Sequence, residues 1–479
     1  MGSNSCDYES QYHALLFPFM AKGHLIPLLQ LARLLLRRRF VITVITTPAN
    51  IPFVAKSLED TTVSIVELPF PQSIPGIPSG VESTDKLPSM SLFPEFARST
   101  KAMQPEFERV VATLEPVNFM VSDGFLWWTL ESANKFGFPR LAFFGMSNYA
   151  SSVSKAASQE GLLFGPESDN EPITVPEFPW IKITRNDFDP VFADPNPESI
   201  HFEFVMDSAV AAVQSFGTLV NSFYELEPTF ADYINRDGDS KSWNVGPLCL
   251  VETPPRLDQS RKKPAWIQWL DQKLEQGSSV LYIAFGSQAE LSTEQLRDIA
   301  TGLEESEVNF VWVIRKDASE LGDGFEERVK ERGIVVRDWV DQREILKHQC
   351  VHGFLSHCGW NSVLDSICAG VPILAWPMMA DQRLNARMVV EEIKVGLRVE
   401  TCNGSVKGYV KSEGLKKMVR ELMEGEMGKE VRKKAKEVAE MAKKAMEEET
   451  GSSWLSLSKL IDQICNEKKP RKELMARRN

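Results

Sequence analysis

The sequence lacks several features that would place it in a broad class at once. No apolar run approaches the roughly 18 uninterrupted residues of a membrane span, so none is expected. Basic residues are outnumbered: 54 Lys and Arg face 66 Asp and Glu, a net charge of −12, which argues against a nucleic-acid partner. The first residues show no basic and apolar signal-peptide pattern. We therefore expect a cytoplasmic protein with neither a membrane span nor a nucleic-acid partner.

Cysteine is scarce and dispersed. The seven cysteines include no Cys-x-x-Cys pair, which favours free thiols in a reducing compartment over a disulfide framework. Three histidines, His348, His352 and His357, lie close in sequence to Cys350 and Cys358, and zinc uses both residue types as ligands. A strand through the middle of this cluster would separate its members and point adjacent side chains to opposite faces. We expect no metal ion there.

The usual glycine-rich nucleotide fingerprints are also missing. No GxGxxG follows a predicted strand and no GxxxxGK[ST] occurs, which weakens a dehydrogenase or a P-loop enzyme; without GxSxG an α/β-hydrolase loses support too. Two Asp-x-Asp triplets, beginning at Asp187 and Asp237, could hold a divalent ion against a diphosphate. Both lie among Pro, Asn and Gly residues, so we interpret them as turns.

What the chain does have is a regular alternation of apolar strand segments with helix-period segments. Such alternation predicts parallel sheets with helices on both faces. A proline-containing segment at 251–264 divides the chain and is predicted to be a linker. We therefore predict an α/β protein with doubly wound domains at 1–250 and 265–451, followed by a helix and a basic tail at 452–479. The predicted strands are His13–Phe17, Val41–Thr46, Val63–Leu68, Phe119–Val121, Leu141–Phe144, Thr218–Asn221, Val280–Phe285, Phe310–Ile314, Ile334–Val336, Gly353–Ser356 and Ile373–Ala375.

The most informative segment is a block that runs from Trp339 to Gln382. It resembles the 44-residue donor-binding signature of plant secondary-product UDP-glycosyltransferases, family 1. The resemblance covers the whole chain and implies the GT-B fold, in which two Rossmann-like domains face a cleft and the C-terminal helix crosses back to the first domain. The matching motifs are Trp339-x-x-Gln342, His357-Cys358-Gly359-Trp360-Asn361-Ser362, Asp381-Gln382, Gly23-His24-x-x-Pro27, Trp269-Leu270-Asp271 and Phe285-Gly286-Ser287.

The residue types in this block suit a nucleotide diphosphate independently of the resemblance. His357 ends a predicted strand, and a helix is predicted from Gly359 to about Cys368. The free N–H groups and the dipole at such a helix start bind anions. Asn361 and Ser362 could add donors, or could only cap the helix.

The resemblance assigns the donor contacts and implies UDP-glucose as co-substrate. Trp339 would stack on uracil, although a core position is the alternative. Gln342 and Asp365 would bind the ribose; the family usually has Glu at position 365. Gln382 is associated with glucose and Trp360 argues against a glucuronosyl donor, while Asp381 could instead cap a helix over 382–393. The predicted donor-binding residues are Ser287, Trp339, Val340, Gln342, His357, Gly359, Trp360, Asn361, Ser362, Asp365, Asp381 and Gln382.

Two residues of the first half are predicted to be catalytic. His24 lies between the first predicted strand and its helix, and because a helix start disfavours imidazolium we expect a neutral ring near pH 7. By the resemblance, His24 takes the proton of the acceptor hydroxyl and Asp123 bonds its other ring nitrogen. The alternative makes both residues helix caps. Attack opposite the α-linked UDP would invert the anomeric centre and yield a β-glucoside, with no cofactor and no metal.

The acceptor is predicted to be a small lipophilic molecule. We expect a plant phenolic such as a flavonoid or phenylpropanoid, with a terpenoid or steroid as the alternative, and we expect a monomer. A noncatalytic UDP-sugar binder would keep the donor block without needing His24 and Asp123. The predicted acceptor-binding residues, several of which could equally be core, are Phe19, Phe93, Phe125, Met146 and Ser147.

Overall fold

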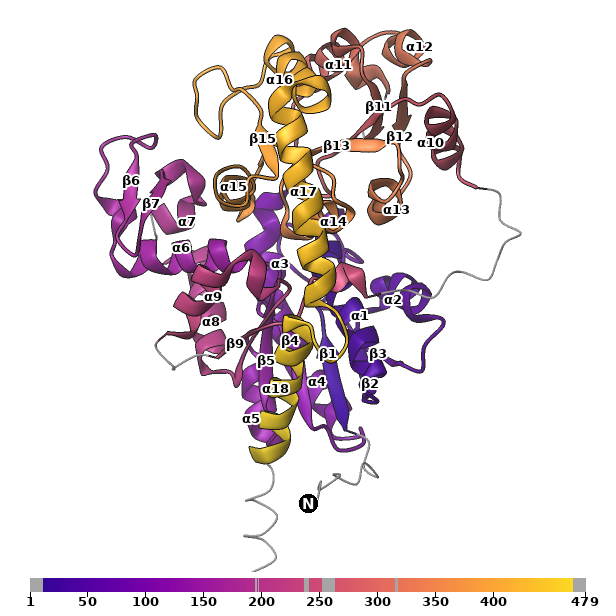
Figure 1. The fold of residues 1–479 in the computed structure, drawn as a ribbon. Helices are drawn as coiled ribbons and strands as arrows, with labels where there is room; N and C mark the ends of the chain where they lie inside the picture. Colours follow the sequence, from indigo (N-terminus) through magenta and orange to yellow (C-terminus); the bar gives the residue numbers. More distant parts are fainter. Residues whose placement is uncertain are drawn as a thin grey trace, which may run out of the picture.

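The chain forms two lobes, each built on its own parallel sheet (Figure 1). The predicted linker lies largely outside the residues that the computed structural model describes, as do Asp237 and the basic tail, so the domain boundaries stay a prediction. The described residues are 12–193, 196, 198–236, 241–251, 263–314 and 318–467.

The first lobe contains a seven-stranded sheet in the order β3-β2-β1-β4-β5-β8-β9. Every neighbouring pair in it is parallel. The chain begins in the middle at β1, runs outward to β3, and then crosses to β4 on the other side of β1. This reversal creates a switch point between β1 and β4. The strands are β1 (His13–Phe17), β2 (Val41–Thr46), β3 (Ser64–Glu67), β4 (Phe119–Asp123), β5 (Arg140–Phe144), β8 (Gly217–Val220) and β9 (Ser242–Asn244).

The second lobe repeats this topology with six parallel strands in the order β12-β11-β10-β13-β14-β15. Its switch point lies between β10 and β13. Both sheets have the doubly wound order in which ligands bind beyond the carboxyl ends of the strands at the reversal. The strands are β10 (Val280–Ala284), β11 (Asn309–Val313), β12 (Gly333–Val336), β13 (Val351–Ser356), β14 (Ile373–Ala375) and β15 (Gly396–Arg398).

Helices cover both sheets, as apolar strands buried on two faces require. In the first lobe these are α1 (Lys22–Arg37), α2 (Ile51–Leu58), α3 (Phe93–Ser99), α4 (Gln104–Val111), α5 (Thr129–Phe136), α6 (Asn148–Gln159), α7 (Pro190–Ala193), α8 (Ile200–Gln214) and α9 (Pro228–Asn235). In the second they are α10 (Ala265–Glu275), α11 (Thr293–Ser306), α12 (Phe325–Val329), α13 (Gln342–Leu346), α14 (Trp360–Ala369), α15 (Gln382–Arg387), α16 (Ser412–Glu424) and α17 (Glu426–Ala445).

The structure confirms the predicted parallel sheets and adds elements that the sequence pattern missed. An antiparallel hairpin, β6 (Ile173–Val175) with β7 (Phe178–Ile183), projects from the first lobe (Figure 1). The edge strands β9 and β15 have only three residues each, too few to show a periodicity. The helix expected over 382–393 is α15 followed by a π-helical turn, Met388–Glu392. Helix α1 begins at Lys22, so His24 lies inside its first turn rather than before it.

The last helices connect the lobes. α17 runs down from the second lobe, and α18 (Ser452–Glu467) lies along the first (Figure 1). Leu457, Leu460 and Ile464 are buried in the apolar core beside β1, β2 and α1. The Arg38 guanidinium lies 3.3 Å from the centre of the Trp454 ring and fixes the end of α1 to α18. Within the described residues, no helix is both long and apolar enough to cross a membrane.

We expect Leu457→Ala to destabilise the first lobe strongly. The Leu457 side chain is 1% exposed, and truncating a buried leucine costs about 2–5 kcal/mol of unfolding free energy. Leu455, on the same helix, is 43% exposed, so Leu455→Ala should change stability by less than about 0.5 kcal/mol. Urea unfolding of the two variants measures this difference, and equal midpoints would show that α18 is not part of the core.

Candidate active site

The functional residues gather at the switch points of the two sheets. His24 follows β1, and Asp123 is the last residue of the neighbouring strand β4. In the second lobe, Ser287 follows β10 and His357 follows β13. Because parallel strands end at one edge, residues far apart in sequence become neighbours, as His24 and Asp123 do across 99 positions.

A buried carboxylate holds the imidazole of His24. His24 Nδ1 lies 2.7 Å from Asp123 Oδ2, and Asp123 is fully buried while the histidine side chain is 23% exposed. The other oxygen, Oδ1, accepts a hydrogen bond from the backbone N–H of Phe125 at 3.0 Å. A carboxylate only accepts hydrogen bonds, so the proton belongs on Nδ1 and Nε2 is left to accept one. This geometry suits a general base held in one tautomer.

Burial and the neighbouring acid Asp123 have opposite effects on the pKa of His24. Burial lowers this pKa, but the charge and hydrogen bond of Asp123, with a smaller effect of Asp381, outweigh burial and raise the pKa above its ordinary value. The helix start is not among these causes, and the neutral ring near pH 7 stays a prediction. The acid partner makes the imidazole a stronger base.

Across from His24, the start of α14 presents backbone N–H groups that no side chain caps. Gly359 is the N-cap residue and has no side chain to bond them. Asn361 and Ser362 do not cap the helix either: Asn361 Nδ2 donates to the carbonyl of Gly23 at 2.6 Å, and Ser362 Oγ accepts from Gln342 at 3.1 Å. The first turn of α14 therefore keeps its donors for an anion.

The ring of His357 packs tightly between two glycines at this helix start. A Cβ at Gly286 or at Gly359 would lie 2.7 or 2.6 Å from His357 Nε2, closer than a Cβ approaches other atoms, so a side chain at either position would displace the imidazole. Burial lowers the pKa of His357 to about 4. The ring is thus neutral near pH 7 and offers one N–H without a full charge.

The nucleoside end of the site contains an exposed aromatic and a buried acid. Trp339 is 60% exposed, which excludes the core alternative and leaves its face open for stacking, whereas the Val340 side chain is buried. Gln342 Nε2 donates to Asp365 Oδ2 at 2.9 Å as well as to Ser362, so the glutamine turns toward the acid. Burial raises the pKa of Asp365 to about 6.

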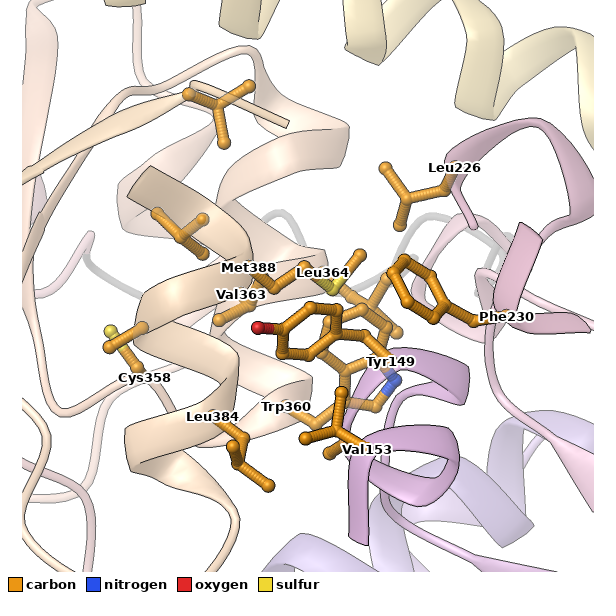
Figure 2. Close-up of a cluster of buried hydrophobic side chains, with 14 of the residues drawn as sticks. Tyr149, Val153, Leu226, Phe230, Cys358, Trp360, Val363, Leu364, Leu384 and Met388 are labelled. Carbon is orange, nitrogen blue, oxygen red and sulfur yellow. The ribbon is translucent and has the colours of Figure 1, made fainter. Parts of the chain in front are cut away.

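Trp360 has a different position from that of a sugar contact. Its indole is 2% exposed and donates from Nε1 to the carbonyl of Asn221 at 2.8 Å. Figure 2 shows it beside Tyr149 and Val153 of the first lobe. Trp360 therefore connects the lobes, and its side chain can affect donor choice only through the packing of α14.

The sugar end of the block is organised by a residue that sequence reasoning missed. Asn385 Nδ2 donates to Asp381 Oδ2 at 2.8 Å and to the carbonyl of Cys358 at 3.1 Å, and its Oδ1 accepts from Ser147 Oγ. The i, i+4 spacing from Asp381 is the signal that could have found it. Gln382 Oε1 accepts from the N–H groups of Met378 and Met379, both at 3.0 Å. Burial raises the pKa of Asp381 to about 6.

Aromatic rings surround His24 on the acceptor side. The Phe125 ring centre lies 4.9 Å from that of His24, and Phe93 lies 5.7 Å from Phe125. Both side chains are partly exposed, whereas Phe19 is fully buried, and its ring centre lies 5.6 Å from that of His24. Phe204, from α8, packs on Phe125 at 5.2 Å and was not predicted, because no local pattern links α8 to α1.

One acceptor prediction does not fit the structure. Ser147 is fully buried; its Oγ caps α6 by accepting from the N–H of Ala150 and donates to Asn385. The Ser147 hydroxyl is therefore not open to an acceptor. Met146 is partly exposed and packs against the apolar cluster between the lobes, so its place in an acceptor lining stays a prediction.

The remaining predicted clusters lie away from the reacting groups. His348 is held by Asp271 at 3.2 Å and by Cys350, at the far end of β13 from His357. The carboxylate of Asp187 accepts a hydrogen bond from Thr184 within a turn. It also forms an ion pair between the lobes with Arg387, at 2.8 Å. The described part of the chain holds no group of three His, Cys, Asp or Glu side chains arranged for a metal ion.

Comparison with known proteins agrees with this geometry. The family described as UDP-glucoronosyl and UDP-glucosyl transferase matches residues 262–440. UDP-glycosyltransferase 90A1 of Arabidopsis thaliana is 57% identical over 95% of this chain and 96% of its own. UDP-glucose flavonoid 3-O-glucosyltransferase 7 of Fragaria ananassa is 34% identical over 97% of this chain and 98% of its own.

A solved structure shows the same fold. Phytolacca americana UGT2, complexed with UDP-2fluoro-glucose and pterostilbene, superposes with a TM-score of 0.79 at 28% identity, covering 95% of this chain and all of the other. The chain is therefore a GT-B enzyme, and it belongs to the plant family 1 UDP-glycosyltransferases.

We expect Asp123→Asn to lower the pKa of His24. Without the carboxylate, burial is left as the main influence, and burial disfavours the charged ring. A general base must be neutral to accept a proton, so activity rises as the pH rises through the pKa of His24. In the variant, the acid limb of kcat/KM should therefore move to lower pH. The maximum of kcat/KM should fall, because the imidazolium loses its stabilising carboxylate. NMR titration of His24 and the pH profile measure the shift; Asp381→Asn should give a smaller shift in the same direction. An unchanged titration would contradict the pairing.

Proposed function

We propose that the protein transfers glucose from UDP-glucose to a hydroxyl of a small plant phenolic, with inversion at the anomeric carbon. The observation that carries the proposal is the 2.6 Å bond from Asn361 to the carbonyl of Gly23. It ties the uncapped start of α14, which suits a diphosphate, to the residue next to the base His24. The leaving group and the proton acceptor are thereby brought to one place.

The donor is proposed to lie along the ends of β10, β13 and α14. Uracil would stack on the exposed face of Trp339. The ribose hydroxyls would donate hydrogen bonds to the Asp365 carboxylate and replace the hydrogen bond that Gln342 now donates to it. The N–H groups at the start of α14, with His357 and Ser287, would bind the diphosphate. The two bonds from the loop to Gln382 Oε1 leave its Nε2 end for a sugar hydroxyl, beside Asp381.

The proposed reaction needs only these side chains. Nε2 of His24 takes the proton of the acceptor hydroxyl as the oxygen attacks the anomeric carbon, while the carbon–oxygen bond to UDP breaks on the opposite face. Asp123 holds Nδ1–H and stabilises the imidazolium that forms. The helix start stabilises the charge that develops on the departing diphosphate, so no metal ion is invoked.

The acceptor class is proposed from the rings around His24. Phe93, Phe125 and Phe204 form a group of edge-to-face contacts that presents aromatic surface on one side of the imidazole. A flat aromatic acceptor would pack on such rings with its hydroxyl toward Nε2. The flavonoid named for the relative from Fragaria ananassa supports this class.

We expect His24→Ala to lower kcat with a phenolic acceptor of weak acidity by about 10²–10⁴-fold, the usual contribution of a general base. The assay mixes purified protein with UDP-glucose and a panel of phenolics, and follows UDP release together with the hexose adduct by mass spectrometry. His352→Ala is the matched control, because this imidazole is exposed on β13. If the His24→Ala variant kept the turnover of the unmodified protein, the assignment of the base would be refuted. If the unmodified protein bound UDP-glucose but never released UDP with any acceptor, a noncatalytic binder would be favoured.

Trp339→Ala should weaken UDP binding with little effect on the fold. Stacking between an aromatic side chain and a base contributes about 1–3 kcal/mol, so Kd should rise roughly fivefold to 100-fold. Trp180 is also exposed but lies on β7, and Trp180→Ala should leave Kd unchanged. Isothermal titration with UDP measures both variants, and equal affinities would exclude stacking on Trp339.

A further inference from the structure

Two cysteines from different lobes lie side by side behind the donor site. Cys249 lies in a short 3₁₀ turn, Leu248–Leu250, where the chain leaves the first sheet, and Cys368 lies in the last turn of α14. Their sulfur atoms are 3.4 Å apart although 119 positions separate them, and both thiols are free. Neither cysteine has a role in the donor contacts, the acceptor contacts or the proton transfer proposed above.

The pair is next to the carboxylate assigned to the ribose. Cys368 follows Asp365 by three positions, so both lie on one face of α14. The Cys249 thiol, which donates its hydrogen bond to Cys368, also lies near Asp365, because it lowers the pKa of that acid against the larger opposing effect of burial. The contact between these thiols therefore joins the end of the first lobe to the helix that holds the nucleotide.

We propose that Cys249 and Cys368 form a site of reversible thiol–disulfide exchange with a small disulfide such as oxidised glutathione, and that the resulting interlobe disulfide weakens donor binding. The exchange itself is independent of the proposed function; its effect on the donor rests on that function. In a reducing compartment such bonds are transient and serve as sensors.

The exchange proceeds in two balanced steps. The Cys368 thiolate attacks one sulfur of oxidised glutathione and releases one glutathione thiolate. The Cys249 thiolate then attacks the Cys368 sulfur of the mixed disulfide and releases the second. Two protein thiols lose two electrons, oxidised glutathione gains them, and the two cysteine protons end on the two glutathione molecules.

The surroundings assign this order. Cys368 is partly exposed, whereas Cys249 is buried. The hydrogen bond to Cys368 and burial raise the pKa of Cys249 well above its ordinary value. Cys249 is therefore the resolving thiol, and ring closure should accelerate with rising pH.

Closing the bond changes the donor site in two ways. A disulfide brings its sulfur atoms to about 2.05 Å, so the two sulfur atoms must move closer than their present 3.4 Å and the side chains behind Asp365 must rearrange. Cys249 also loses its thiol proton, so it can no longer act as a hydrogen-bond donor beside Asp365. The loss of one hydrogen-bond donor beside this acid should weaken UDP binding about threefold to tenfold.

The test uses the full-length protein after incubation with excess oxidised glutathione or with dithiothreitol. Peptide mapping without reduction should find a Cys249–Cys368 cross-link that dithiothreitol removes, and titration with UDP should show the weaker Kd only in the oxidised sample. Cys249→Ser and Cys368→Ser should abolish both effects, whereas Cys402→Ser removes an exposed cysteine outside the pair and should keep them.

Three results would count against the proposal. Glutathione adducts on Cys402 without any Cys249–Cys368 cross-link would overturn the exchange site. A cross-link that leaves the Kd for UDP unchanged would overturn its link to donor binding. The third result is a cross-link in the oxidised sample together with reduced protein that does not bind UDP. The proposed function would then fail and the effect on the donor with it, while the exchange site would stand.

Discussion

The arrangement of the whole site depends on how the first turn of α14 is held by the other lobe. Trp360 and Asn361 are consecutive, and each donates a hydrogen bond to a carbonyl of the first lobe: Trp360 to Asn221, and Asn361 to Gly23. The indole also fills the apolar cluster between the lobes (Figure 2). The uncapped helix start is therefore tied to the residue beside His24, and in the proposed mechanism this couples the position of the base to that of the leaving group.

This constraint explains how an acidic protein can offer a site for a diphosphate. The net charge is −12, and the site itself includes Asp123, Asp365 and Asp381. Burial raises the pKa of Asp365 and of Asp381 to about 6, which reduces the negative charge that each would place near a diphosphate. The positive potential comes instead from the uncapped start of α14. The dipole at the start of α14 thus provides the positive potential that basic side chains would provide in another protein.

Much of the fold and of the site follows from local sequence, and what was missed depends on long-range contacts. Apolar strands alternating with helices predicted both parallel sheets, and the block from Trp339 to Gln382 predicted the family. Roles that depend on tertiary packing were not visible: Ser147 is a cap bonded to Asn385, and Phe204 of α8 packs on Phe125, the ring next to His24. The pKa of His24 also depends on a long-range contact, with Asp123, which is 99 positions away and which the family resemblance had assigned to this ring.

The shortened acid at position 365 fits this picture of mutual support. An aspartate reaches one methylene less far than a glutamate, and Gln342 spans the gap by donating to both Asp365 and Ser362. The amide keeps the buried carboxylate hydrogen-bonded. In the proposed donor placement, ribose would therefore replace an existing partner of Asp365 instead of filling an empty position. The gain in free energy is then the difference between two sets of hydrogen bonds. Donor affinity at this position therefore depends on the Gln342–Asp365 pair, rather than on the acid alone.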